Sequence, residues 1–196
     1  MVTRTGDGAA IPGSALATLQ PGGGTAPMLG DQLRPLLAEL VQTFDENAAL
    51  SVDDGERLLY LSQVTADHAV SVPDVSGEQH LFHLVAPGLV TMAWWPADRI
   101  DAALQKPLDA TTAQSMIDSA ALTKRLGTIR TDGWCWTDQE LDAGVNGLAV
   151  PVLVDEELVA TISLFGPAYR LNPDERPTLA TELAAVVADR CPSLLN

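Results

Sequence analysis

Residues 147–165 read GLAVPVLVDEELVATISLF, and this stretch decides the fold. Two apolar runs, 147–154 and 158–165, flank the acidic pair Asp155-Glu156. Apolar, valine-rich runs of this length around a short polar turn predict two adjacent β-strands. A shorter run over 134–137 precedes them, so the last third of the chain is expected to hold three strands.

Outward from this hairpin, a second one is predicted near the start of the chain. Residues 48–52 and 57–64 are mostly apolar and are joined through Asp53-Asp54-Gly55. The Asp-Gly pair favours the positive φ angles that a tight hairpin turn needs. A further strand is expected over 69–72.

Helical spacing of apolar residues predicts the remaining elements. In residues 31–45, leucines and Phe44 form one stripe, with Asp31 as the expected N-cap and Pro35 in the first turn. Three further helices are predicted over 84–95, 97–105 and 112–126. A final helix is expected to begin at Asn172, which caps it, with Pro173 in its first position.

The order of elements indicates the fold class. A helix, three strands, several helices, three strands and a last helix follow one another, and short connections favour antiparallel pairing. We therefore predict an α+β fold with helices packed on a mostly antiparallel sheet. No glycine-rich loop stands between a predicted strand and a predicted helix, so a nucleotide-binding doubly wound fold is disfavoured and no cofactor is expected.

Composition limits what the protein does. The chain of 196 residues has the length of one domain with an appendage, and 46% hydrophobic residues are ample for one core. The 11 Lys and Arg against 26 Asp and Glu give a net charge of -15, which repels nucleic-acid phosphates and anionic lipids. The chain also lacks a long apolar run, so we expect a cytoplasmic protein that does not span a membrane.

Two groups of residues could carry catalytic or metal chemistry. Cys135 with His83 as base and Asp138 would form a nucleophilic site, although the flanking indoles do not lower the pKa of a thiol as cations would. His80 and His83 could ligate a metal ion, but no third ligand stands at a recognisable spacing. Packing roles are the simpler interpretation, and no metal site is predicted.

Several motifs resemble the effector-binding domain of IclR-type transcriptional regulators. In the last third they are Gly133-Trp134, Glu140, Gly144-Val145, residues 148–152 (LAVPV) and residues 163–167 (SLFGP). Upstream, a second motif of that family is matched by Gly77, His83, Ala86 and Gly88. The resemblance covers about residues 28–192. It implies a GAF-like domain whose cupped sheet binds a small effector, coupled to a winged helix-turn-helix that binds operator DNA.

The resemblance also implies how the N-terminal residues are organised. Residues 2–8 look like the tip and second strand of the wing, and residues 11–16 look like the start of the linker helix. Residues 1–27 are thus expected to be a remnant of wing and linker, and residues 28–196 to be the effector-binding domain. DNA would be bound only through a helix-turn-helix domain absent from this chain.

Family members that sense small carboxylic acids hold them with amide donors at a helix start and with Asp, Cys and Ser side chains of the sheet. This chain differs at those positions: Pro87 has no N–H to donate, and Phe165 replaces a hydroxyl with a ring. Such a lining suits an aromatic or otherwise apolar ligand, unless the pocket is filled by its own side chains. The predicted effector-binding residues are Val72, His83, Ala86, Pro87, Trp136, Thr137, Asp138, Gly147, Ser163 and Phe165.

Taken with the resemblance, these residues predict an effector-binding and oligomerisation domain, not an enzyme. The expected partners are a small effector and further copies of the chain in a homodimer or homotetramer, with paired indoles such as Trp94-Trp95 as interface candidates. Two alternatives stay open. A small cytoplasmic enzyme would require Cys135, His83 and Asp138 to converge on one cavity, whereas a ligand-free structural oligomerisation module would have no cavity.

Overall fold

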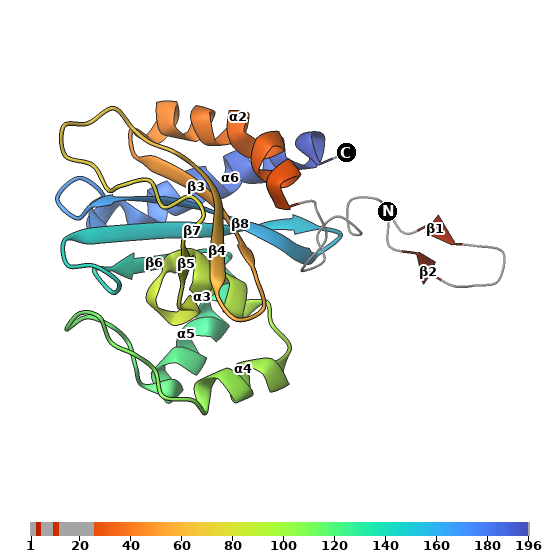
Figure 1. Ribbon diagram of the computed structural model, residues 1–196, viewed down its shortest axis with the longest axis vertical. Coiled ribbons are helices and arrows are strands. Elements are labelled where there is room, and N and C mark those ends of the chain that lie inside the picture. Colours follow the sequence, from red (N-terminus) through yellow and green to blue (C-terminus); the bar gives the residue numbers. More distant parts are fainter. Residues whose placement is uncertain (1–2, 5–9, 12–25, 196) are drawn as a thin grey trace.

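The computed structural model describes residues 3–4, 10–11 and 26–195 (Figure 1). Within 26–195 the strands form one antiparallel, six-stranded sheet with helices on both faces. The strand order is β5-β4-β3-β8-β7-β6. In that order the strands span Gln79–His80, Leu58–Val64, Asn47–Asp53, Glu157–Pro167, Val145–Val154 and Cys135–Asp138. The predicted α+β fold with a mostly antiparallel sheet is confirmed.

Both predicted hairpins are present, and their turns adopt the backbone conformations that the sequence favours. Between β3 and β4, Gly55 has a φ of 96°, and its N–H donates to the Asp53 carboxylate at 2.9 Å. Between β7 and β8, Asp155 and Glu156 have φ values of 50° and 67°. Two successive positive φ angles give a turn whose twist matches that of the flanking strands. This turn therefore fixes the register of β7 against β8.

Each face of the sheet has its own core. Helices α2 (Ala26–Phe44) and α6 (Arg176–Leu194) cover one face and pack against residues such as Leu148 and Leu164. Helices α3 (Ala86–Ala93) and α5 (Ser119–Asp132) cover the other face, where Ala149 and Phe165 are buried. Successive side chains of a strand point to opposite faces, so β7 and β8 are apolar on both.

Between the two hairpins the chain forms the helical layer that positions the site. The helix predicted over 84–95 is present as a 3-10 turn, η1 (Phe82–Leu84), followed by α3, and α4 (Ala97–Leu104) follows where 97–105 was predicted. Gly88 in α3 lies directly against Phe82, since a Cβ at Gly88 would overlap the Phe82 carbonyl oxygen. Glycine is therefore required there, and this contact fixes the first turn of α3 beside η1.

The helix predicted over 112–126 is wrong in its bounds, because α5 spans Ser119–Asp132. Asp118 caps α5, and its carboxylate accepts a hydrogen bond from the Ala121 N–H at 2.7 Å. The preceding segment is held as a turn by its hydroxyls: Thr112 Oγ1 donates to a carbonyl oxygen of the β6–β7 connection at 2.7 Å. Those bonds prevent a helix before residue 118.

The strand predicted over 69–72 is also wrong. Residues 65–78 form an irregular segment, which we name the cover loop, and the edge strand β5 follows it. The side-chain amides of Asn47 and Gln63 bond to backbone groups of the cover loop. The loop backbone therefore has polar partners without joining the sheet.

Helix α2 begins earlier than predicted. Leu29 extends the apolar stripe toward the N-terminus and is 4% exposed, so the helix starts at Ala26. Asp31 consequently lies inside the helix and is not its N-cap. Pro35 lies in the helix interior, where its missing N–H removes one hydrogen bond of the helix.

At the C-terminal end the predicted cap is confirmed. The Asn172 side chain accepts a hydrogen bond from the Asp174 N–H at 3.1 Å and begins η2 (Pro173–Glu175). Helix α6 continues directly from this turn. Its Leu183 and Val187 are buried against the same face of the sheet as α2.

Near the N-terminus, β1 (Thr3–Arg4) pairs antiparallel with β2 (Ala10–Ile11). Ile11, expected at the start of a linker helix, lies in β2 instead. The other residues of the predicted wing and linker, 2, 5–8 and 12–16, lie outside the described residues. Among the helices that the structure describes, none is long and apolar enough to cross a membrane.

Candidate functional site

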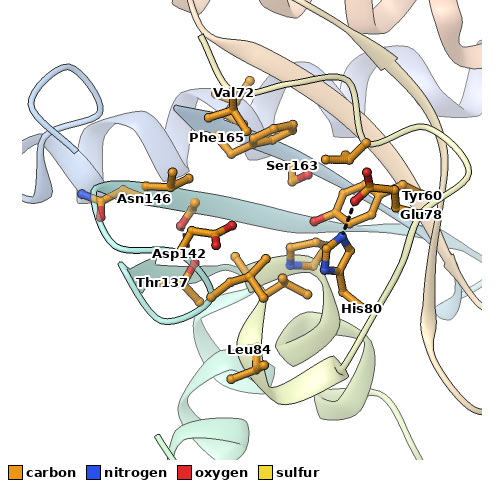
Figure 2. A pocket seen from close by; sticks show the side chains of 18 of the residues that line it. Tyr60, Val72, Glu78, His80, Leu84, Thr137, Asp142, Asn146, Ser163 and Phe165 are labelled. Carbon is orange, nitrogen blue, oxygen red and sulfur yellow. Dashed lines mark hydrogen bonds and ion pairs between the residues drawn. The ribbon is translucent and has the colours of Figure 1, made fainter. Parts of the chain in front are cut away.

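A cavity of about 210 Å³ lies between the sheet and the first turn of α3, beside the cover loop (Figure 2). Strands β4 to β8 and the cover loop all contribute to its wall. Its apolar lining includes Val72, Val75, Leu84, Ala86, Pro87 and Phe165. Its polar side chains include Tyr60, Glu78, His80, Thr137, Asp142 and Ser163. The cavity is therefore an apolar chamber with a few separate polar groups.

Alternation along the strands decides which side chains face the cavity. On β8, Ser163 and Phe165 line it, whereas the side chain of Leu164 between them packs in the core under α2 and α6. On β6, Thr137 lines the cavity, and Trp136 packs on the opposite face. On β6 and β8 the period of two therefore selects which side chains face the cavity.

Gly147 on β7 keeps the cavity open. A Cβ at this position would lie 2.9 Å from Thr137 Oγ1 and 3.6 Å from the Ala86 Cβ. It would thus fill the space between the floor of the sheet and the first residue of α3. The backbone φ at Gly147 is not in the left-handed region, so its role here is the missing side chain rather than an unusual conformation.

Two hydroxyl groups inside the cavity lack a good partner. Ser163 is 1% exposed, and its Oγ makes no hydrogen bond to any described residue. Thr137 Oγ1 reaches the Gly147 carbonyl oxygen at 3.5 Å, which is the long limit of a hydrogen bond. A buried hydroxyl without a partner destabilises the fold by about 1–3 kcal/mol. A polar group of a ligand would remove that cost.

Tyr60, His80 and Glu78 form a connected group on one side of the cavity (Figure 2). The Tyr60 and His80 rings meet edge to face, with centroids 5.5 Å apart. His80 Nε2 lies 3.2 Å from Glu78 Oε2. Burial, and secondly the charge of Glu78, raise the pKa of Tyr60, so its phenol stays protonated and can donate a hydrogen bond.

The charged groups of the cavity are acidic. Glu78 and Asp142 are both exposed and lie where the cavity meets solvent. No Lys or Arg lines the cavity among the residues that the structure describes. The Nε2 atom of His80 lies against the Glu78 carboxylate at 3.2 Å.

The cover loop is attached to the sheet by two buried amides. Asn47 Nδ2 donates to the Val72 carbonyl oxygen at 3.3 Å, and Asn47 Oδ1 accepts from the Ala66 N–H at 2.9 Å. Gln63 Oε1 accepts from the Val75 N–H at 2.9 Å. Because Val72 and Val75 line the cavity, Asn47 and Gln63 position part of its wall without touching its interior.

Seven of the ten predicted site residues line this cavity. They are Val72, Ala86, Pro87, Thr137, Gly147, Ser163 and Phe165. They come from the cover loop, the start of α3 and strands β6, β7 and β8. The departures from the acid-sensing pattern, above all Pro87 and Phe165, thus lie in one place.

The structure does not bring the other three to the cavity. Trp136 is buried on the opposite face of β6 because it neighbours Thr137. Asp138, one residue beyond Thr137, is exposed at the end of β6. His83 is buried, but its Nε2 bonds to the carbonyl oxygen of Asp109 at 2.8 Å, toward the segment after α4.

Sequence reasoning missed the polar group on the other side of the cavity. Tyr60 follows Leu58 by two positions, which places both on the inner face of β4. This alternation was a usable signal. Glu78 and His80 depended on the short edge strand β5, and Asp142 depended on the turn before β7; neither had a clear local pattern.

The residues of the alternative enzyme site do not converge. Cys135 is buried on the α3 side of β6, and Arg125 Nη2 lies 3.9 Å from its sulfur. Burial raises the pKa of Cys135 to about 12 even though Arg125 opposes the shift. His83 and Asp138 have other partners, and none of the three residues lines the cavity. Among the described residues, no group of three or more His, Cys, Asp or Glu is placed to hold a metal ion.

Comparison with known proteins identifies the family. Residues 28–191 match the domain described as Bacterial transcriptional regulator IclR C-terminal. An HTH-type transcriptional regulator of Mycobacterium tuberculosis is 33% identical over 156 residues, which are 79% of this chain and 60% of that protein.

Two solved structures have the same fold. The Thermotoga maritima IclR aligns with a TM-score of 0.74 at 19% identity, over 99% of this chain and 78% of its own. An IclR homolog of Microbacterium hydrocarbonoxydans, solved with 4-hydroxybenzoate, aligns with a TM-score of 0.75 at 23% identity, over 95% of this chain and 77% of its own.

The fold and the family match together define the class of protein. This chain belongs to the IclR family of bacterial transcriptional regulators, and residues 28–191 form the C-terminal, effector-binding domain of that family. The chain spans 60% of the length of the Mycobacterium regulator that it matches.

Proposed function

We propose that this domain senses a small aromatic or otherwise apolar effector, which binds in the cavity beside α3 and alters DNA binding by a transcriptional regulator. The observation that carries the proposal is an apolar cavity of about 210 Å³ with the unpaired Ser163 hydroxyl inside it. Such a chamber fits a ring with one or two polar substituents. The effector would act by binding one domain arrangement more tightly than another.

A related structure supports an aromatic effector. The Microbacterium homolog was solved with 4-hydroxybenzoate, an aromatic acid. In this chain Phe165 and Tyr60 provide ring surfaces at a centroid distance of 6.4 Å. We therefore propose that the effector contacts the seven predicted residues that line the cavity and also Tyr60, which was not predicted.

The domain is proposed to be a sensor without catalytic activity. Its relatives are named as transcriptional regulators. The predicted candidate nucleophile, Cys135, is buried with a pKa of about 12 and therefore carries almost no thiolate near neutral pH. A cytoplasmic location fits a regulator of transcription.

We further propose that the chain assembles into a homodimer or homotetramer, as symmetric regulators commonly do. Trp94 and Trp95 are only half-buried and adjoin a second, shallower hollow that includes Arg130 and Leu158. Aromatic and arginine side chains are enriched at subunit interfaces. Light scattering at micromolar concentration tests this, and a monomeric mass would contradict it.

Calorimetry on matched glycine variants tests the effector site. Gly147→Leu fills the cavity, whereas Gly127→Leu adds the same side chain to an exposed helix position, where a Cβ would have no other described atom within 4 Å. Wild type and Gly127→Leu are expected to bind hydroxylated aromatic probes such as 4-ethylphenol, and Gly147→Leu is not. Pyruvate and glyoxylate should not bind, because the described residues that line the cavity include no Lys or Arg and Pro87 has no N–H.

A second variant covers the case in which Gly147→Leu does not fold. Phe165→Ser removes an aromatic ring from the cavity wall and should weaken the binding of aromatic probes. Its circular dichroism spectrum should stay that of the wild type, which would show that the variant is folded. Tight binding of a small keto acid, unaffected by either variant, would show that the effector binds elsewhere.

A further inference from the structure

We propose that the effector is an aromatic amine bound as a cation, with its ring in the cavity and its ammonium group at the mouth, where Glu78 and Asp142 lie. This inference rests on the proposed function and adds the charge class of the ligand to it. It sets this domain apart from a sensor of carboxylic acids.

The mouth of the cavity carries two carboxylates, of which Glu78 contacts the His80 imidazole at 3.2 Å. Figure 2 shows Glu78 beside Tyr60 and His80 on one side of the cavity, and Asp142 on the other side. The Asp142 carboxylate makes no hydrogen bond or ion pair within the described part of the chain. Both acids remain hydrated when the cavity is empty, so holding them there costs little. A ligand cation at the mouth would therefore meet acidic side chains and no basic one among the described lining residues.

The inner wall adds a second attraction for a cation. Tyr60, His80 and Phe165 are neighbouring rings, with centroid distances of 5.5 Å for Tyr60 to His80 and 6.4 Å for Tyr60 to Phe165. The faces of aromatic rings carry negative partial charge and attract ammonium groups. The same rings form a stacking surface for the aromatic part of the ligand.

The deep end of the cavity requires a polar substituent on the ring. Ser163 Oγ is buried without a partner, and Thr137 Oγ1 has only a 3.5 Å contact to a carbonyl oxygen. A phenolic hydroxyl reaching this depth would both donate and accept hydrogen bonds. A hydroxyl on the ring opposite an aminoalkyl chain therefore matches the two ends of the cavity.

An anionic ligand meets the reverse conditions. The described lining contains no Lys or Arg, and its imidazole is engaged with Glu78. The helix start offers fewer amide donors because Pro87 stands in the first turn of α3. A carboxylate at the mouth would lie near Glu78 and Asp142, on a chain whose net charge is -15.

Three probes that share the same ring but differ in charge test the proposal by calorimetry at pH 7. Tyramine is a cation, 4-ethylphenol is neutral and 4-hydroxyphenylacetate is an anion, and all carry the same phenol. We expect tyramine to bind about tenfold more tightly than 4-ethylphenol, and the anion to bind most weakly.

Charge-neutralising variants then identify the residues. Glu78→Gln with Asp142→Asn should lower the ratio of the affinity for tyramine to that for 4-ethylphenol from about ten to about one. Glu56→Gln is the control, since Glu56 is exposed in the β3–β4 turn and does not line the cavity. Ser163→Ala should weaken the binding of all three probes about equally, because all three carry the phenol.

The outcomes separate this inference from the function on which it rests. Tighter binding of 4-hydroxyphenylacetate, equal binding of tyramine and 4-ethylphenol, or an equal effect of Glu56→Gln would overturn the cationic ligand and keep the aromatic sensor. Binding of none of the three phenols, together with the absence of any difference between Gly147→Leu and wild type, would overturn both.

Discussion

Two buried arginine–carboxylate pairs connect the sheet to its surroundings. Arg125 on α5 donates to both carboxylate oxygens of Glu140 at 2.8 Å, and their side chains are 19% and 8% exposed. Arg170, after β8, binds Glu46 at 2.6 and 3.1 Å in the same two-pronged way. Paired donors and acceptors of this geometry are the strong form of the interaction. They fix the β6–β7 connection and the start of β3.

Removing one partner of the first pair is expected to destabilise the fold. Glu140→Gln leaves the Arg125 guanidinium largely buried without its counter-ion, so the free energy of unfolding should fall by about 3 kcal/mol. Glu39→Gln is the matched control, because the side chains of Glu39 and Arg190 are 42% and 52% exposed. This substitution should change the free energy of unfolding by less than about 1 kcal/mol. Urea denaturation measures both. Equal effects of the two substitutions would contradict this difference in burial.

Single residues also explain which parts of the site the sequence could predict. Gly147, Ser163 and Phe165 lie in strands with strong apolar patterns, so their positions and common face could be inferred. Trp136 and Thr137 are neighbours on one strand and cannot share a cavity, which a stricter use of alternation would have shown. His83 could not be placed, since its partner Asp109 follows it by 26 positions.

At the scale of elements, the residues of a turn were sufficient to predict the structure where the turn itself determines it. The sequence predicted the Asp-Gly turn, the Asp-Glu turn and the Asn172 cap, because each acts on residues next to it. The cover loop could not be predicted in this way. Its backbone groups bond to Asn47 and Gln63, and Asn47 is as many as 25 residues away from its partner in the sequence. No local sequence pattern therefore predicts the loop.

Loss of one of these amides should loosen the cover loop. Asn47→Ala removes the acceptor for the Ala66 N–H and the donor for the Val72 carbonyl. Amide hydrogen exchange over residues 66–75 should become faster, and the affinity for a bound phenol should fall by about tenfold through a faster off-rate. The overall fold should persist, because the hairpins do not depend on this bond.

The control lies in the same loop. Asp74→Ala breaks only a local turn, in which the Asp74 carboxylate accepts from the Ser76 N–H at 2.9 Å. It should leave exchange in the rest of the loop and the affinity for the phenol nearly unchanged. An Asn47→Ala protein with the exchange pattern of the wild type would show that the loop is held by other contacts.

At the scale of the whole molecule, the sheet separates the cavity from helices α2 and α6 (Figure 1). A chain of contacts nevertheless crosses from one side to the other. Gln63 holds the cover loop at Val75, and its own carbonyl oxygen accepts from Arg34 of α2 at 3.5 Å. Arg34 also donates to Ser62 at 3.3 Å. A ligand that displaces the cover loop would therefore act first on the contact between β4 and the first long helix of the domain.

The charge of the whole molecule leads to the last prediction, that this chain alone does not select a DNA sequence. A net charge of -15 opposes the release of counterions that drives binding to a duplex. Several described arginines are also paired with acids, as Arg99 is with Asp53 at 2.6 Å. Fluorescence anisotropy with duplex fragments at moderate salt should show no sequence-selective binding, with or without tyramine. Selective binding that weakens steeply with salt would mean that these residues include a DNA-reading surface.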